Sequence, residues 1–206
     1  MKIIENMLVM MALMVLATNC SHTKGLSSAN KTAEQSIEAA KVGGKAGEAI
    51  SRYMDRQASE IRTDLPTNVT VSTKDEAVTL IYQGDSLFKD STSTTLTPAA
   101  KTHLNNLAGT LRKYKNTNIV VEGYTALTND LHKDVEFSSD RAKTVAQYLE
   151  SQKVGGKRIK YVGYGAASPL AQNNTQQGRV QNRRIEMAIY ANDSLKTQAK
   201  NGQLPY

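Results

Sequence analysis

The sequence has no tryptophan, two phenylalanines, three histidines and one cysteine among its 206 residues. A single cysteine cannot form an intramolecular disulfide or a metal site that needs several thiolates. The nine tyrosines do not gather in an aromatic run between basic residues, so a platform for stacking nucleic-acid bases is not expected. Cysteine and histidine also show no zinc-site spacing. These absences argue against disulfide-framework, zinc-binding and nucleic-acid-binding proteins.

Enzyme motifs are lacking as well. The sequence contains no G-x-S-x-G nucleophile motif. The stretch from Gly163 to Ser168 has two glycines but lacks the third glycine of a dinucleotide-binding loop. The histidines, at positions 22, 103 and 132, are scattered along the chain. We therefore predict a protein that is not an enzyme and that binds no cofactor or metal.

Basic residues exceed acidic ones, with 26 Lys and Arg against 19 Asp and Glu, which gives a net charge of +7. Such a surface suits an anionic partner such as cell-wall polymer, lipid headgroups or nucleic acid. A solvated basic surface without a partner gives the same count, because net charge alone says little about partners.

The first twenty residues resemble an export signal. Lys2 precedes an apolar run from Met7 to Ala17, and Cys20 follows shortly after. About 11 apolar residues are too few to span a bilayer as a helix but are typical of a signal-peptide core. Cys20 resembles the acylated first residue of a mature bacterial lipoprotein, although Asn19 stands where a small residue is usual. We predict a signal peptide over residues 1–19 and a lipid such as palmitate on Cys20; the alternative is a soluble exported protein with a spare thiol.

Residues 20–65 are predicted to be a lipidated tether followed by a helical linker. Ser21 to Asn30 is small and polar, as in a flexible tether. Lys31 to Leu65 is rich in Ala, Glu, Lys, Arg and Gln, which favour helix. Gly43, Gly44 and Gly47 interrupt the helical pattern, so we expect this helix to be bent.

A globular domain is predicted from Val69 to Ala191, and residues 192–206 are predicted to be a loose polar tail. Helices are expected after Thr97-Pro98 and from Ser138, each with an apolar stripe. Strands are expected at Val78–Tyr82, Asn118–Gly123, Ile159–Tyr164 and Ile185–Ile189. This alternation predicts an α+β fold, a two-layer sandwich in which helices cover one face of a mixed four-stranded sheet.

Six separated motifs reinforce this prediction. They are Gly84–Phe88, Leu96–Pro98, Glu122–Thr125, Ser138–Ala142, Gly163–Pro169 and Asn173–Glu186. In this order and spacing they resemble the OmpA-like domain, a peptidoglycan-binding domain. The resemblance covers roughly Val69 to Ala191 and implies the βαβαβ-β arrangement of that family.

The resemblance also implies a ligand and a site. The family binds peptidoglycan noncovalently through the diaminopimelate of the stem peptide, whose free end is a zwitterion. An arginine must clamp the carboxylate and an acid must meet the ammonium, because charge-assisted pairs are the strong ones. The family loop reads G-H-T-D, whereas residues 123–126 here read G-Y-T-A. By resemblance the clamp is Arg141, and the remaining site residues are Thr125, Asp134, Tyr124, Asp130, Phe88 and Arg179.

Ala126 stands where the family has the acid that meets the ammonium, and its methyl group accepts no hydrogen bond. Losing one partner of a desolvated charge pair costs about 2–5 kcal/mol, enough to erase a micromolar affinity. Three interpretations stay open. Asp134 or Asp130 supplies the missing carboxylate; or the domain binds a wall group that lacks the free ammonium; or wall binding is lost and the domain is an envelope scaffold for other proteins.

The resulting prediction is an outer-membrane lipoprotein whose domain faces the periplasm and anchors the membrane to the cell wall. Its partners are then peptidoglycan and, through the N-terminal lipid, the outer membrane. Export makes nucleic acid an unsuitable partner. Under the third interpretation the partners are other envelope proteins.

Overall fold

The computed structural model describes residues 32–84 and 86–204. The predicted signal peptide, Cys20 and the polar tether therefore lie outside the described residues. Across the two described ranges, no helix is both long enough and apolar enough to cross a membrane.

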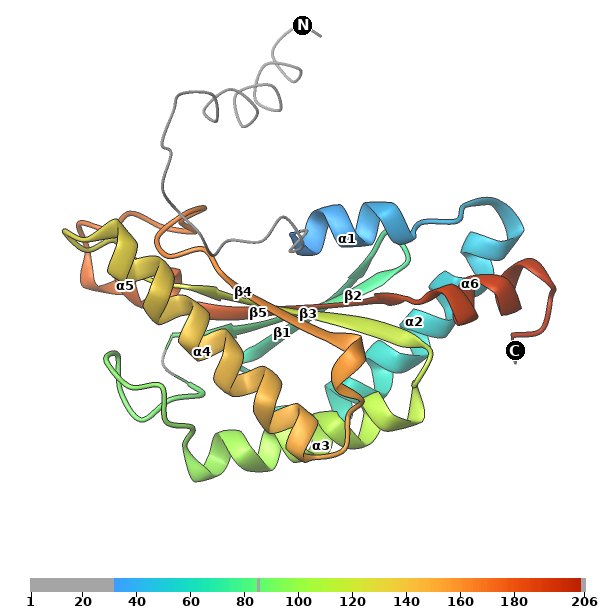
Figure 1. Ribbon diagram of the computed structural model, residues 1–206, viewed down its shortest axis with the longest axis horizontal. Helices are drawn as coiled ribbons and strands as arrows, with labels where there is room; N and C mark the ends of the chain where they lie inside the picture. Colours follow the sequence, from blue (N-terminus) through green and yellow to red (C-terminus); the bar gives the residue numbers. More distant parts are fainter. Residues whose placement is uncertain (1–31, 85, 205–206) are drawn as a thin grey trace, which may run out of the picture.

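A five-stranded mixed sheet forms the centre of the domain (Figure 1). Its strands are β1 (Val69–Lys74), β2 (Ala77–Gln83), β3 (Thr117–Tyr124), β4 (Ile159–Gly163) and β5 (Arg184–Ala191). The spatial order is β1-β2-β5-β3-β4, and only the β3–β4 pair is parallel. The predicted α+β fold with a mixed sheet is confirmed.

The prediction of four strands was one short, because it missed the edge strand β1. Most of the residues of this strand are exposed or half-buried, so it lacks clear apolar alternation. Its hairpin turn uses Asp75 and Glu76 at φ values of 55° and 62°. Such turns usually contain Gly or Asn, and neither occurs here, so the residues do not indicate a hairpin turn at this point.

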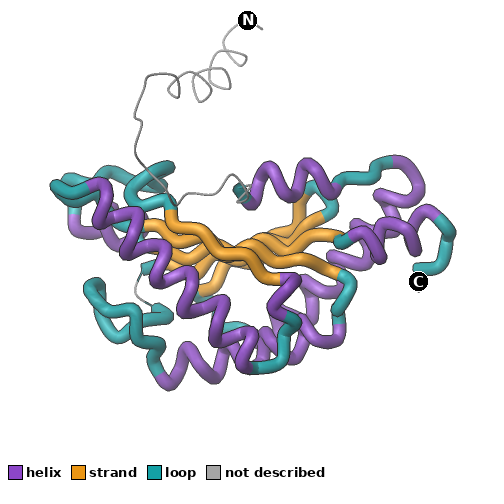
Figure 2. The backbone as a smooth tube through the Cα atoms, in the orientation of Figure 1, coloured by secondary structure: helices purple, strands orange, loops and turns teal. Residues whose placement is uncertain are grey.

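Helices α2 (Gly44–Asp64), α3 (Pro98–Lys113) and α4 (Leu131–Ser151) pack on one face of the sheet (Figures 1 and 2). Short elements η1 (Gly156–Arg158) and α5 (Gln176–Asn182) precede β4 and β5. Thr97 caps α3 as predicted, since its hydroxyl accepts a hydrogen bond from the Ala100 N–H. The second predicted helix starts earlier than expected, at Leu131, because Asp130 rather than Ser138 caps it.

The upstream helix α2 belongs to the main core and does not merely link the tether to the domain. Ile50, Ala58 and Ile61 are 0% exposed and Met54 is 1% exposed. These four residues share a core cluster with the inner faces of α3, α4 and the sheet. The bend predicted at the glycines is present as a break, since a shorter helix α1 (Ala33–Ala40) ends just before α2 begins.

Replacing Ile61 with alanine is expected to lower the free energy of unfolding by about 2–5 kcal/mol, because it leaves a cavity in a closed core. Ser59→Ala, at an exposed position of the same helix, is the matched control and should have little effect. Urea denaturation measures both variants. Equal stabilities for the two variants would mean that α2 is only a linker.

Two further segments differ from the expectations. Helix α1 lies on the opposite face of the sheet, where its Ala40 forms a small cluster with Ala77, Val120 and Tyr190 (Figure 1). Helices therefore do not cover one face alone. The predicted loose tail contains α6 (Asp193–Lys200), in which Leu195 and Ala199 are buried. These two apolar residues are too few to stand out in a polar segment.

Candidate functional site

Two glycines allow α4 to approach the ends of β3 and β4 closely. Gly123 and Gly163 are register partners in the parallel pair. A Cβ on Gly123 would collide with the Ser138 carbonyl, and a Cβ on Gly163 would collide with the Ser139 backbone nitrogen. The Ser138 hydroxyl accepts a hydrogen bond of 2.9 Å from the Gly165 N–H, which ties α4 to the chain after β4. The site is built on this junction.

Arg141 lies on the inner face of α4 and is 2% exposed. Its Nε donates to the Ser93 carbonyl at 3.0 Å and its Nη2 to the Asp90 carbonyl at 2.7 Å. The guanidinium carbon lies 4.4 Å from the Phe88 ring centroid and 4.6 Å from that of Phe137. Cation–π contacts of this kind hold an arginine in one place. Arg141 is therefore a preorganised cation at the junction of α4 with the loop after β2.

That loop is itself ordered by Asp90. The Asp90 carboxylate accepts hydrogen bonds from the Thr92 N–H at 2.8 Å and the Thr92 hydroxyl at 2.7 Å. These bonds hold the pKa of Asp90 below its usual value, and the charge of Arg141 lowers it further. The turn presents the carbonyls to which Arg141 donates.

Asp134 shares the buried face of α4 with Arg141 and is 4% exposed. Its carboxylate accepts from the Thr128 N–H at 3.0 Å and from the Thr128 hydroxyl at 2.8 Å. Arg141 follows it seven positions later in the helix, which is about two helical turns or about 10.5 Å of rise. Side chains on a helix lean toward its N-terminus, so Arg141 leans toward the turn of Asp134. A carboxylate has about four lone-pair sites, so Asp134 keeps acceptor capacity beyond these two bonds.

Asp130 has a different task. Its carboxylate caps α4 by accepting from the Lys133 N–H at 3.1 Å, and it pairs with the Lys133 ammonium at 3.2 Å. The backbone bond and the side-chain bond to Lys133 lower the pKa of Asp130. Its side chain is 44% exposed, outside the buried face that holds Asp134 and Arg141.

Thr125 and Ala126 form the buried start of the loop after β3. The Thr125 N–H donates to the Gly165 carbonyl at 2.8 Å. The Thr125 hydroxyl is buried and has no hydrogen-bond partner among the described residues. Ala126 is 8% exposed and places a methyl group where the resemblance implies a carboxylate. An unsatisfied buried hydroxyl is costly, so a ligand group that bonds to it would gain affinity.

The structure does not bring Tyr124 to this site. Neighbouring residues of a strand point to opposite faces of the sheet. The Tyr124 hydroxyl donates to the Glu122 carboxylate at 3.0 Å on the face covered by α1. Its ring stacks on Tyr164 at 5.4 Å and lies beneath the Arg184 guanidinium at 3.8 Å. Burial raises the pKa of Tyr124, and the charge of Glu122 raises it further.

Arg179, another predicted site residue, fixes the neighbouring loop. Its Nη1 donates to the Asn173 carbonyl at 3.0 Å. The Asn173 side-chain oxygen in turn accepts from the Leu127 N–H at 3.0 Å and from the Asn182 amide at 2.9 Å. Arg179 and the fully buried Asn182 therefore hold the loop that follows Ala126.

Two contributors to the site were not predicted. Phe137 stands one turn before Arg141, a spacing that could have indicated the ring contact. Thr128 gives no signal in the sequence, since its role depends on the loop folding back toward Asp134. Among residues 32–84 and 86–204, no three His, Cys, Asp or Glu side chains are placed to hold a metal ion.

Residues 87–183 match the sequence profile of the OmpA family. These residues therefore form an OmpA-like domain. It is 35% identical over 144 residues to the probable lipoprotein YiaD of Escherichia coli, an alignment that covers 69% of this chain and 65% of the relative. It is 37% identical over 94 residues to the peptidoglycan-binding protein ArfA of Mycobacterium tuberculosis, covering 46% of this chain and 29% of the relative.

A solved structure shows the same fold. The cell-wall anchor of the type VI secretion system from Pseudomonas aeruginosa superposes with a TM-score of 0.57 at 25% identity, covering 68% of this chain and 97% of that chain. The chain spans less than two thirds of the length of YiaD and less than one third of ArfA. The likeness therefore concerns only part of each relative.

Proposed function

We propose that this protein is a non-enzymatic outer-membrane lipoprotein that holds the cell wall through the diaminopimelate of the peptidoglycan stem peptide. In this proposal a lipid on Cys20 anchors it in the membrane and the OmpA-like domain faces the periplasm. The names of two relatives support this proposal: one is a probable lipoprotein, which fits the membrane anchor, and the other is a peptidoglycan-binding protein, which fits the wall contact.

The observation that carries the proposal is the pair Arg141 and Asp134 on one buried face of α4. The free end of diaminopimelate has a carboxylate and an ammonium on one carbon. Arg141 clamps the carboxylate in a site whose geometry the two phenylalanine rings fix in advance. Asp134 meets the ammonium, because position 126 holds alanine instead of the acid that the resemblance implies. The Thr125 hydroxyl supplies a further polar contact.

Cosedimentation with purified sacculi tests this function. The domain should sediment with walls that contain diaminopimelate and remain in the supernatant with walls that contain lysine at that position, because a lysine side chain has no terminal carboxylate. Ala126→Asp adds a second acid and should retain binding. Equal binding to both walls would contradict the zwitterion as ligand. If only the Ala126→Asp protein sediments, the native site is inactive and the proposal is wrong.

A second candidate function has an observation of its own. Leu127, Leu131 and Val135 are 49%, 65% and 37% exposed at the loop after β3 and the start of α4. Exposed apolar residues beside a site suit contact with another protein. An envelope scaffold that binds protein through this region is the alternative if the native domain does not retain sacculi. Leu131→Asp should then abolish capture of the partner and leave the fold intact.

The lipid anchor has a separate test. Cys20→Ala should abolish metabolic labelling by a fatty-acid analogue in cells and move the protein from the membrane fraction to the soluble fraction. Labelling that persists in the Cys20→Ala protein would refute acylation at this residue and would leave the wall-binding site untouched.

A further inference from the structure

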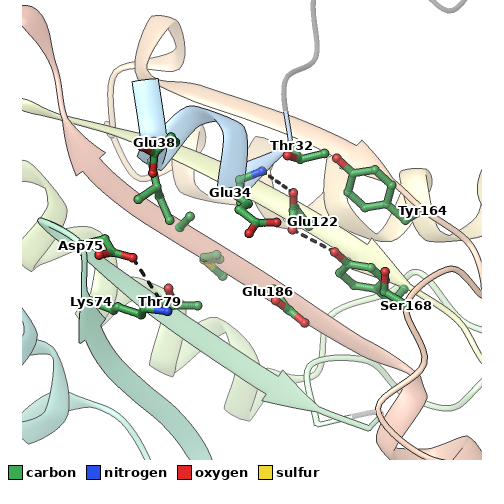
Figure 3. Close-up of a pocket in the computed structure, with 15 residues that line it drawn as sticks. Thr32, Glu34, Glu38, Lys74, Asp75, Thr79, Glu122, Tyr164, Ser168 and Glu186 are labelled. Atoms are coloured by element: carbon green, nitrogen blue, oxygen red, sulfur yellow. Dashed lines mark hydrogen bonds and ion pairs between the residues drawn. The ribbon is translucent and has the colours of Figure 1, made fainter. Parts of the chain in front are cut away.

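Glu122 is a buried carboxylate on the face of the sheet that α1 covers. It lines a cavity of about 400 Å³ between α1 and strands β3 and β5 (Figure 3). Its register partner across the strands is Glu186, and like charges directly opposite each other destabilise a sheet. Glu186 is paired with Arg184 at 2.5 Å. Glu122 instead accepts the Ala33 N–H of α1 at 2.6 Å and the Tyr124 hydroxyl at 3.0 Å.

The bond to Ala33 fixes the start of α1. The first N–H groups of a helix have no partner within the helix, and the helix dipole favours a negative charge near them. Thr32 caps the same end through the Gln35 N–H. The N-terminus of α1 is thus held on the sheet by a carboxylate of β3, two residues before that strand ends.

A second carboxylate fixes the other end. Glu76, in the β1–β2 turn, accepts the Val42 N–H at 3.0 Å and the Gly43 N–H at 2.9 Å. Gly43 has a φ of 70°, which makes the sharp break between α1 and α2. Glu122 and Glu76 together clamp both ends of α1.

Between the clamps α1 buries little. Within the helix, only Ser36 and Ala40 are buried, while Ala33 and Ile37 pack partly against the sheet. An eight-residue helix is marginal in water by itself. With so few buried contacts, α1 belongs to the part of the fold that opens at the lowest free-energy cost.

We propose that α1 is a releasable strap that sets how far the tether upstream of the domain can reach. When α1 is docked, its first residue lies beside Glu122, near the C-terminal end of β3. The chain then enters the domain on the face of the sheet opposite α2, α3 and α4 (Figure 1). Released as far as Gly43, the chain leaves from the start of α2, at the other end of the sheet. The freed residues 33–43 add about 35–40 Å when extended. The value of this extra reach rests on the proposed anchoring function.

The surroundings of Glu122 shift its pKa in both directions. Burial raises the pKa of Glu122 and the charge of Glu186 adds to this, while the hydrogen bonds from the Ala33 N–H and the Tyr124 hydroxyl oppose it. The group faces Glu186 and the Arg184 that pairs with it from β5, Tyr124 from β3, Tyr164 after β4, and α1 with its Glu34. The Ala33 N–H therefore donates to a carboxylate whose charged form this bond favours.

Spin-label distances test the strap in the full chain without its lipid, made with Cys20→Ser. Labels are placed at Ala39→Cys on α1 and Ser72→Cys on β1, both exposed positions. With Glu76 and Glu122 intact, the two labels should show one narrow distance distribution. Glu76→Gln and Glu122→Gln should each raise the broad, released population about tenfold, the effect of losing a charged hydrogen-bond partner. Glu38→Gln, which removes only an exposed pair with Lys41, is the matched control and should change nothing.

A narrow distance that persists in the Glu76→Gln/Glu122→Gln double variant, with circular dichroism showing an intact fold, would overturn the strap. Because the distances are measured without the wall, this outcome is independent of any failure to bind sacculi.

Discussion

Replacing Arg141 with alanine is expected to release the domain from sacculi that contain diaminopimelate. The ligand carboxylate would lose its only proposed clamp, a loss of about 2–5 kcal/mol or at least roughly thirtyfold in affinity. Arg141→Lys keeps the charge but not the planar fork, so it should recover only part of the binding. The measurement is the fraction of domain that sediments with sacculi across a range of wall concentrations.

Arg141 also supports the fold, since its loss removes the Nε donor of the Ser93 carbonyl and leaves the Asp90 carbonyl only the Ser93 N–H. The matched control is therefore another arginine that donates to backbone carbonyls away from the site. Arg158 bonds to the carbonyls of Leu111, Tyr114 and Thr117. Arg158→Ala should lower stability and leave wall binding of the folded protein unchanged. Equal loss of binding in both variants would assign the Arg141 effect to folding rather than to ligand contact.

Gly163→Ala is expected to cause a large loss of stability. A Cβ at this position would collide with the Ser139 backbone and the Ser138 hydroxyl, and the Ser139 backbone cannot move without shifting α4. Overpacking of this kind costs about 1–3 kcal/mol and occasionally more. Because α4 holds Asp134 and Arg141, the shift should weaken wall binding as well. Urea denaturation and sacculus cosedimentation measure the two effects.

Gly109→Ala is the matched control for the glycine substitution. Gly109 lies inside α3, where the nearest atom to a new Cβ would be an Arg112 side-chain nitrogen at 3.9 Å. Alanine favours helix over glycine by about 1 kcal/mol, so this variant should be more stable than the native protein. If Gly163→Ala were as stable as Gly109→Ala, the close approach of α4 to β4 would not be required.

The sequence predicted the sheet centre and the two domain helices because their apolar residues recur with clear strand or helix spacing. Elements whose burial depends on distant partners were harder to recognise. Strand β1 is an exposed edge, and its turn contains neither Gly nor Asn. Helix α6 has only two buried apolar residues. The core role of α2 follows from contacts with α3 and the sheet that sequence spacing does not encode.

For the proposed site, the resemblance indicated Arg141 but left both Asp130 and Asp134 open. Our proposal uses Asp134, because Asp130 caps α4 with a side chain that is 44% exposed, whereas Asp134 falls on the buried face with Arg141. Tyr124 was assigned to the site from its place in the loop motif, yet it still belongs to β3 and points to the other face. Strand alternation decides its direction, and the motif alone does not state where the strand ends.

The most direct measurement is calorimetric titration of a stem peptide ending in diaminopimelate into the native domain, Asp134→Asn, and the double variant Asp134→Asn/Ala126→Asp. Asparagine keeps the size of the side chain and an oxygen for Thr128, so the fold should persist. Asp134→Asn should lose about 2–5 kcal/mol of binding free energy, because the ammonium loses its counter-charge. The double variant should recover most of it through the new acid at position 126. Native affinity in Asp134→Asn would contradict the pairing of Asp134 and Arg141 as the peptidoglycan site.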